Sequence, residues 1–235
     1  MSGRFISFEG LDGCGKSTQM EKLASALRAA GHDVVTTREP GGTAIGERIR
    51  ELLLDSRTLG LDANTELALM FAARAQHVEQ VIRPALAAGK IVLSDRFTDS
   101  SEAYQGGGRK LGSEAVLALH RALCGELQPE LTILLDCEPA RSVNRARRRN
   151  RQHQRNGADE NRFERENQQF FDRVRRAYRE IARREPRRVV LIEAQRKIET
   201  VHREVLEAVE KGDLVRGGRS LFVRFVLSLV LRRNS

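Results

Sequence analysis

The 235-residue chain alternates between short apolar runs and longer segments in which apolar residues recur every three or four positions. The first pattern is typical of buried strands and the second of amphipathic helices. It predicts strands at 4–9, 33–39, 90–95, 131–136 and 187–193. It predicts helices at 16–30, 45–54, 65–88, 113–124, from 139 into an arginine-rich stretch, 163–184 and 198–211. Residues 150–160 are polar without an apolar period, and we expect a loop there.

Strands that alternate with helices favour a parallel sheet covered on both faces. In such α/β sheets, ligands bind beyond the carboxyl ends of the strands. This rule predicts one shared site built from Glu9–Thr18, Arg38–Thr43, Asp95–Arg109 and the segment after Asp136. The length suits a single α/β domain, with or without an appendage.

The strongest motif is "GLDGCGKS", Gly10–Ser17, which matches the P-loop pattern between a predicted strand and a predicted helix. Its glycines allow backbone N–H groups to turn inward around phosphate oxygens. Lys16 would supply a cation to the β- and γ-phosphates, and Ser17 a hydroxyl to Mg²⁺. The predicted ATP-binding residues are Gly10, Leu11, Asp12, Gly13, Cys14, Gly15, Lys16, Ser17 and Thr18.

Two further segments end predicted strands. In "SDRFTDSSEAYQGGGR", Ser94–Arg109, we expect Asp95 to hold Mg²⁺ or its water shell opposite Ser17, and Arg96 to clamp a phosphate. "TREPGGT", Thr37–Thr43, places a charged pair at a turn that faces the same cleft.

Together, "FEGLDGCGKST", "REPGGT", "DRFTDSSEAYQGGGR" and "LLDCEP" resemble, in order and spacing, the bacterial thymidylate kinases over about residues 4–210. The resemblance implies a P-loop nucleoside monophosphate kinase fold: a five-stranded parallel sheet flanked by helices, with a lid. It implies the reaction ATP + dTMP → ADP + dTDP with Mg²⁺, as a step towards dTTP, in a homodimer.

The resemblance also implies roles for individual residues. Asp12 matches the carboxylate that receives the sugar 3′-OH, and Arg96 matches the phosphate clamp. Arg38, Glu39 and Arg50 fall near the dTMP phosphate and sugar. Arg74, Ser101 and Gln105 match positions that read the thymine edge, and Tyr104 matches the residue that crowds the 2′ position.

One position departs from the family pattern. The family usually has a phenylalanine four residues before the base-reading arginine, whereas here Met70 lies four before Arg74 and Phe71 three before it. Both offsets fall on the same face of a helix, so we expect Phe71 to stack on thymine.

The net charge is +9, and the segment Arg141–Arg165 alone holds nine arginines against three acids. The P-loop has no basic residue between its glycines, which resembles the kinases that deliver an arginine from a lid, here about 145–163. Arg149, Arg151 and Arg162 are the predicted catalytic lid residues, together with Lys16, Asp95 and Arg96. The alternatives are a kinase for another nucleoside or nucleotide, and a P-loop protein that uses the run to bind nucleic acid. No aromatic residue lies within 141–162 to stack on bases, which disfavours the second.

The three cysteines form no CxxC pair, no signal peptide is evident, and no apolar run reaches about 20 residues, so we expect a cytoplasmic protein. We expect a kinase domain over 1–211 and a basic, hydrophobic extension over 212–235. Within it "RSLFVRFVLSLVLRR", Arg219–Arg233, has the pattern of an amphipathic helix that lies on an anionic membrane surface or docks on protein.

Overall fold

The computed structural model describes residues 3–154 and 162–212, with the backbone alone described for 149–154. The strands are β1 (Arg4–Glu9), β2 (Val34–Arg38), β3 (Ile91–Asp95), β4 (Leu131–Asp136) and β5 (Val189–Glu193). The α-helices are α1 (Lys16–Ala29), α2 (Ala44–Leu54), α3 (Ala63–His77), α4 (Arg83–Ala87), α5 (Thr98–Ser101), α6 (Ser113–Cys124), α7 (Pro139–Gln154), α8 (Gln168–Arg184) and α9 (Ile198–Lys211). Two π-helical segments, η1 (Val78–Ile82) and η2 (Glu102–Gly108), and a 3₁₀ turn, η3 (Phe163–Arg165), complete the described elements.

The strands form one sheet in the order β2-β3-β1-β4-β5, and every pairing is parallel. The central strand β1 pairs with β3 on one side and β4 on the other, with Phe8 opposite Asp95 and Glu9 opposite Leu134. Strands β2 and β3 therefore lie on one side of β1, and β4 and β5 lie on the other. In such sheets, ligands bind in the crevice beyond the carboxyl ends of the strands at this switch point. The predicted five-stranded parallel fold is confirmed.

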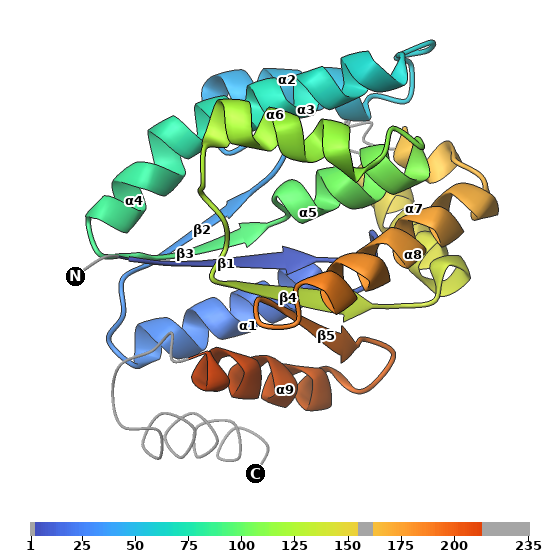
Figure 1. Cartoon of the computed structure of the whole chain (residues 1–235). Coiled ribbons are helices and arrows are strands. Elements are labelled where there is room, and N and C mark those ends of the chain that lie inside the picture. The colour runs from blue at the N-terminus through green and yellow to red at the C-terminus, as the bar shows by residue number, and fades with distance from the viewer. Residues whose placement is uncertain (1–2, 155–161, 213–235) are drawn as a thin grey trace.

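Successive side chains of β1 point to opposite faces of the sheet, as the two-residue period of a strand requires. Ile6 and Phe8 pack with residues of α1 and α9 in one apolar cluster. Phe5 belongs to a cluster on the other face, towards α3 and η1. Helices α1 and α9 lie side by side beneath the sheet, and α3 and α6 lie above it (Figure 1). The same alternation points Glu9 to the upper face, into the region of the site.

Helix α8 begins five residues later than the predicted start at 163, because Asn167 caps it. The Asn167 side chain accepts a hydrogen bond from the Phe170 backbone N–H at 2.9 Å, and a cap of this kind satisfies a donor at the helix start. Phe163–Arg165 forms a separate 3₁₀ turn ahead of it. The helix lies over β4 and β5, and five of its buried residues belong to the same apolar cluster as Leu134 and Val189.

Arginines also fix α8 and the turn after it to the rest of the domain. Arg175 and Arg179 bind the Asp136 carboxylate at the end of β4. Arg184 forms two hydrogen bonds with Glu102, and Arg188 forms two with Asp99. Burial alone would raise the pKa of Asp136, but the two guanidiniums outweigh it and hold that pKa below its usual range. These four arginines are therefore paired with carboxylates of the fold.

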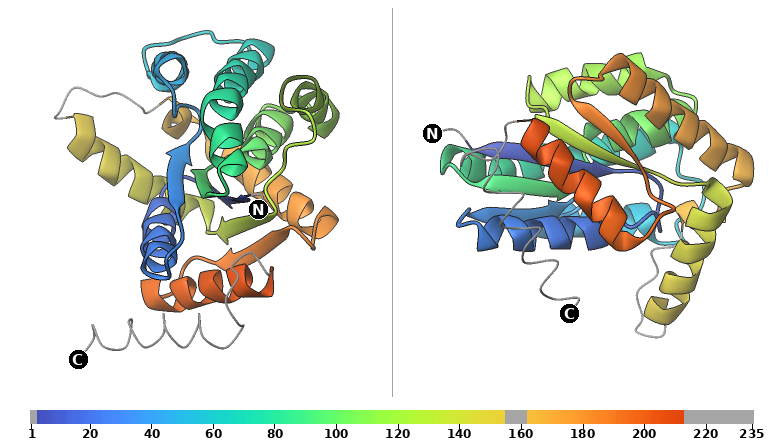
Figure 2. Two further views of the ribbon diagram at one scale, coloured as in Figure 1. Left: turned by 90° about the vertical axis from the view of Figure 1, so that its left-hand side faces the viewer. Right: turned by 90° about the horizontal axis from the view of Figure 1, so that it is seen from below.

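Helix α7 extends to Gln154, which corrects the first part of the loop predicted over 150–160; residues 155–160 lie outside the described residues. Arginine and glutamine are good helix formers, and the segment has no glycine or proline before Gly157, so the helix continues without an apolar period. The helix projects away from the sheet (Figure 2). Across the described residues, no helix is long and apolar enough to cross a membrane. The predicted helix at Arg219–Arg233 lies outside them.

Candidate active site

The P-loop leaves the end of β1 and runs into the first turn of α1. Gly10, Gly13 and Gly15 all have positive φ angles, of 131°, 83° and 102°. A side chain at Gly13 would also collide with the backbone oxygen of Ser142. The loop therefore needs glycine for conformation and for close approach to α7, and its N–H groups line a concave surface at a helix start.

The other residues of the loop differ in burial. Leu11 and Cys14 are buried in the apolar clusters on opposite faces of the sheet, and burial raises the pKa of the Cys14 thiol. Ser17 and Thr18 are exposed at the start of α1. The side chains of Leu11 and Cys14 therefore belong to the core, and those of Ser17 and Thr18 are open to a ligand.

Lys16 is the buried cation of the loop, with only 5% of its surface exposed. Its Nζ donates to the backbone oxygens of Gly10 and Leu11, both at 3.2 Å. Two carboxylates lie slightly farther away, Asp12 at 3.7 Å and Asp95 at 4.0 Å. The loop thereby holds the ammonium group between β1 and β3, where it would meet phosphate oxygens.

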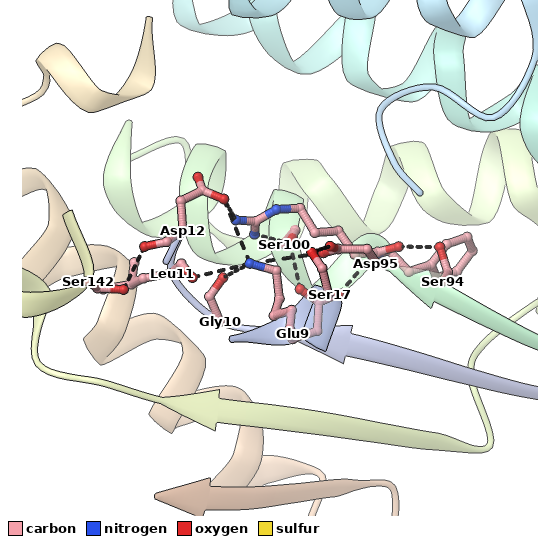
Figure 3. A network of polar contacts seen from close by, with 12 residues as sticks. Glu9, Gly10, Leu11, Asp12, Ser17, Ser94, Asp95, Ser100 and Ser142 are labelled. Atoms are coloured by element: carbon pink, nitrogen blue, oxygen red, sulfur yellow. Dashed lines mark hydrogen bonds and ion pairs between the residues drawn. The ribbon is translucent and has the colours of Figure 1, made fainter. Parts of the chain in front are cut away.

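Ser17, in the first turn of α1, and Asp95, at the end of β3, face each other, as predicted. The Ser17 hydroxyl donates to Asp95 Oδ2 at 3.2 Å (Figure 3). The second oxygen, Oδ1, is buried and has no hydrogen-bond partner among the described residues. A serine hydroxyl and a carboxylate oxygen that accepts no hydrogen bond are ligands that Mg²⁺ binds alongside phosphate oxygens. The part of the chain that the structure describes has no group of three or more His, Cys, Asp or Glu side chains suited to a metal.

Arg96 extends from the end of β3 towards the P-loop. Its backbone has a positive φ of 77°, unusual for a residue with a side chain. One guanidinium nitrogen donates to Asp12 at 2.8 Å and to the Tyr104 hydroxyl at 3.2 Å. The other donates to Ser100 at 2.8 Å and to the Tyr178 hydroxyl at 3.1 Å. Strained backbone held by this many partners is common at functional sites.

Glu9 lies beneath Arg96, and the sequence motifs did not assign it a role. Its carboxylate accepts from the Phe97 backbone at 2.7 Å, from the Tyr178 hydroxyl at 3.0 Å and from Ser100. Burial, together with the charge of Asp99, raises the pKa of Glu9 to about 7, against the opposing effect of Arg96. An acid at the last position of a buried strand was the only sequence signal for it.

A cavity that is partly open to solvent lies between the P-loop and α3. Predicted residues on its wall are Asp12, Glu39, Arg50, Arg74, Arg96, Ser101, Tyr104 and Gln105. Sequence reasoning missed Pro40, Leu54, Met70, Ser100, Phe163 and Glu164 on the same wall. The cavity therefore combines residues from six separate stretches of the chain.

Arg74 is the most constrained cation of the wall, with 2% of its surface exposed. Its Nε donates to Glu39 at 2.6 Å, and its Nη2 donates to Ser101 at 2.9 Å. The third nitrogen, Nη1, is buried with no hydrogen-bond partner among the described residues. Burial alone would raise the pKa of Glu39, but Arg74 and His77 outweigh it and lower that pKa. Arg74 is therefore held in one orientation by Glu39 and Ser101, and one of its nitrogens has no hydrogen-bond partner among the described residues.

Phe71 does not lie on the cavity wall, which corrects the prediction that it stacks on a base. Its side chain is 0% exposed and packs in the apolar core with Leu67 and Val78. The Arg74 guanidinium lies 4.5 Å above its ring. Met70, four residues before Arg74, is the side chain that reaches the cavity. The helical offset of one residue turns Phe71 about 100° away, into the core.

Arg38 also lies apart from the wall. Its side chain is 52% exposed and forms an ion pair with Glu47 at 2.9 Å, at the start of α2. Arg50, by contrast, lines the cavity and donates to the Pro40 backbone oxygen at 3.0 Å. Of the predicted phosphate and sugar residues, Glu39 and Arg50 therefore line the cavity, whereas Arg38 does not.

Of the three predicted lid arginines, the structure describes the side chain of Arg162 only. Arg162 donates to the Leu53 backbone oxygen and forms an ion pair with Glu66 at 2.8 Å, so its guanidinium faces α2 and α3. The side chains of Arg149 and Arg151 lie outside the described residues, although the α7 backbone that carries them is described.

Comparisons with known proteins agree with this geometry. The family model for thymidylate kinase matches residues 8–205. Thymidylate kinase of Desulfovibrio desulfuricans is 50% identical over 217 residues, covering 92% of this chain and 99% of that protein. One from Pseudomonas putida is 51% identical over 201 residues, covering 86% and 93%. The crystal structure of thymidylate kinase from Ehrlichia chaffeensis, 33% identical, superposes with a TM-score of 0.70 and covers 89% of this chain and 99% of its own.

Proposed function

The chain belongs to the thymidylate kinase family, and we propose that its P-loop holds ATP while the adjoining cavity holds dTMP. The reaction is transfer of the γ-phosphoryl group of ATP to dTMP, which yields ADP and dTDP. One observation carries the assignment: Arg96 contacts Asp12 of the P-loop and also lines the cavity, so the two halves of the site meet at one cation.

The cavity wall supports thymine as the base. Arg74 Nη1 is a donor with no hydrogen-bond partner among the described residues, and Gln105 offers an amide beside it on the wall. Thymine presents a carbonyl acceptor next to an N–H donor, which an arginine and an amide oxygen complement. Cytosine presents the opposite pattern, and buried polar groups left unpaired make such discrimination steep. Met70 and Tyr104 supply the apolar surface around the base and sugar.

The other end of the cavity supports the phosphate and sugar of dTMP. We assign the acceptor phosphate to Arg96 and Arg50, and the sugar 3′-OH to Asp12. Tyr104, whose ring lies under the Arg96 guanidinium at 4.9 Å, lies close enough to the cavity to crowd a 2′-hydroxyl and favour deoxyribose. Arg38, which does not line the cavity, would meet the phosphate only if its ion pair with Glu47 opened.

The reacting oxygen belongs to a phosphate that is already anionic, so the transfer needs no strong general base. The bond from this oxygen to the γ-phosphorus forms as the bond to the β,γ-bridging oxygen breaks, and ADP carries away the electron pair. Catalysis then consists of alignment and of neutralising charge on the equatorial oxygens. Lys16 and Arg96 are held for that purpose by fixed backbone and side-chain partners rather than by solvent.

We further propose that Mg²⁺ accompanies ATP, held by Ser17 directly and by Asp95 directly or through water. The Asp95 carboxylate supports this, because its Oδ2 accepts from the Ser17 hydroxyl and its Oδ1 accepts no hydrogen bond among the described residues. When bound, the ion would neutralise β- and γ-phosphate charge.

The lid proposal assigns residues 145–163 to closure over ATP, with an arginine delivered from α7 or the segment after it. The projection of α7 from the end of the sheet supports it (Figure 2). An arginine that arrives on closure would also exclude water from the γ-phosphate.

Two alternatives fit less well. A kinase for another nucleotide would not need the donor and acceptor pair at Arg74 and Gln105. A nucleic-acid arm needs arginines that are free to meet phosphates, whereas within the run Arg162 is bound to Glu66 and Arg147 donates to the Glu164 backbone oxygen. A salt titration with DNA separates the arm from the lid, because an arm gives a steep dependence on salt.

For the chain as a whole, we propose a kinase domain over 1–211 that forms a homodimer, and an extension over 212–235 that makes weak contact with anionic membrane surfaces. A chain that ends at Lys211 should keep its kinase activity and lose affinity for anionic vesicles. Loss of activity in a folded truncated chain would place the extension in the active site. Light scattering tests the dimer.

The direct test is a phosphotransfer assay with ATP over a panel of nucleoside monophosphates. We expect dTMP to be far preferred over dCMP and over purine monophosphates. Equal turnover of dCMP would contradict the assignment of Arg74 and Gln105 to the base edge, and absence of dTMP turnover would contradict the function itself.

A further inference from the structure

Glu66, on α3, is a carboxylate with 0% exposure that neither the motifs nor the proposed mechanism uses. Its Oε1 accepts a hydrogen bond from the side-chain NH₂ group of Gln105 at 2.8 Å. Two arginines also bind it, Arg109 from the end of η2 and Arg162 from the segment before η3. Burial of a carboxylate is costly unless it is paired, and these partners supply the pairing. Glu66 therefore links Gln105 on the cavity wall to Arg109 at the end of η2 and to Arg162 before η3.

The pairing fixes which end of the Gln105 amide faces the cavity. A carboxylate flanked by two guanidiniums can only accept hydrogen bonds, so the amide must direct its NH₂ group to Glu66. The carbonyl oxygen, Oε1, then lies at the other end of the amide, and Gln105 itself lines the cavity. Among the described residues, no protein donor is hydrogen-bonded to that oxygen.

The two oxygens of Glu66 have different partners. Oε2 lies 3.1 Å from Arg109 Nη2 and 2.8 Å from Arg162 Nη2. Oε1 accepts the Gln105 amide at 2.8 Å and a longer bond from Arg109 Nε at 3.2 Å. The arginines hold the carboxylate in one orientation, and the remaining acceptor is directed at Gln105.

We propose that Glu66 is a specificity-positioning residue: it locks the Gln105 amide so that an acceptor faces the pyrimidine base. The N3–H of thymine would then donate a hydrogen bond to Gln105 Oε1. The unprotonated N3 of cytosine would instead place its lone pair against that oxygen, which is repulsive. This proposal rests on the proposed function, because it assumes that Gln105 contacts the base of dTMP. It assigns the choice between pyrimidines to a side chain that does not itself line the cavity.

The test is Glu66→Gln, which keeps the size of the side chain. Its amide oxygen would stay between Arg109 and Arg162, because an NH₂ group there would face two cationic donors. Its NH₂ group would then face Gln105 and drive that amide to turn, so that a donor points into the cavity. We expect the ratio of kcat/KM for dTMP to that for dCMP to fall at least about tenfold, mainly through a higher KM for dTMP.

Glu166→Gln is the matched control. Glu166 also binds Arg109, at 2.6 Å, so this variant removes an equal charge from the same arginine without touching Gln105. Its ratio should stay within about twofold of the wild type, since no base-reading group changes orientation. An equal fall in both variants would overturn the proposal, because loss of cluster charge would then explain it.

The double variant Glu66→Gln with Gln105→Glu exchanges donor and acceptor across the same contact. The cluster keeps its charge, and a carboxylate oxygen again faces the base. The dTMP preference should recover, and failure to recover in a folded protein overturns the proposal even if the single variant does not fold. A folded Glu66→Gln protein with an unchanged ratio overturns it as well. A wild type inactive on dTMP would instead overturn the proposed function.

Discussion

The P-loop and the base cavity are adjacent, yet they are built in different ways. The P-loop is one uninterrupted segment whose shape comes from glycine conformations and whose ligand groups are chiefly backbone N–H donors. The cavity wall draws side chains from α2, α3, η2 and the turn before α8, as well as from strand ends. Its charged members, such as Arg74 and Glu39, neutralise one another before any ligand arrives.

This difference predicts how each region responds to change. A backbone site depends on a few side chains, and the loss of its one buried cation cannot be compensated nearby. A side-chain site spreads its task over many partners, so most single changes there should shift specificity before they abolish turnover. The following experiments test that contrast, from the largest expected effect to the smallest.

Lys16→Ala should give the largest loss. It removes the buried cation that meets the β- and γ-phosphates, which should cost several kcal/mol of transition-state stabilisation, or about 10³-fold or more in kcat/KM. Steady-state kinetics measure it, with thermal unfolding to show that the fold survives. Lys211→Ala, an exposed lysine at the end of α9, is the control and should be near wild type. Near-normal turnover of Lys16→Ala would refute the phosphoryl-transfer assignment.

Replacing the lid arginines by alanine one at a time should lower kcat strongly for at least one of them. An arginine finger contributes on the order of 10³ or more. We expect Arg149→Ala or Arg151→Ala to show this loss. Arg162→Ala should have a smaller effect on kcat, because its guanidinium is bound to Glu66 and the Leu53 backbone. If all three variants keep full kcat, the lid proposal fails and the nucleic-acid arm gains.

Glu9→Gln should remove a pH dependence of stability. Burial raises the Glu9 pKa from 4.5 to about 7, so the folded state binds a proton more tightly than the unfolded state. The wild type therefore loses stability as pH rises from about 4.5 to about 7, by at most about 3 kcal/mol. The amide does not titrate. The difference in unfolding free energy between the two proteins should fall through that window and stay constant above it.

Denaturant unfolding at several pH values measures this difference, which cancels the contributions of His202, Asp136 and other groups common to both proteins. A difference that stays constant from pH 4.5 to 7 would show that Glu9 titrates normally.

Met70→Phe should have the smallest effect. It places an aromatic ring on the cavity wall, where stacking on thymine is worth about 0.5–1.5 kcal/mol, so KM for dTMP should fall by a factor of about 2 to 10. Phe71→Leu should instead leave KM nearly unchanged and lower the melting temperature, since Phe71 is a core residue. A large rise in KM for Phe71→Leu would restore the stacking role to Phe71.

Sequence reasoning located the elements well where apolar periods were strong. Helix α9 and strand β4 begin and end where predicted, and α6 does as well. It missed the helical character of 98–108, because three consecutive glycines and several polar residues there resemble a loop. The structure makes it π-helical over Glu102–Gly108, and close packing explains two of the glycines. A Cβ at Gly107 or Gly108 would press on Ala177 or Phe170 of α8.

The sequence by itself determined the fold class, the phosphate loop and the family, because these depend on local spacing: glycines and a lysine within eight residues, and strands that alternate with helices. Only the tertiary structure decided that Met70 rather than Phe71 faces the cavity, and that Arg162 is bound to a carboxylate. It also decided that Glu9 and Glu66 are buried, with Glu66 bonded to Gln105. Those outcomes depend on burial and on contacts between residues far apart in the chain, such as Glu66 and Arg162. Burial sets the cost of every unpaired charge, and no local pattern records which partner will be near enough to offset it.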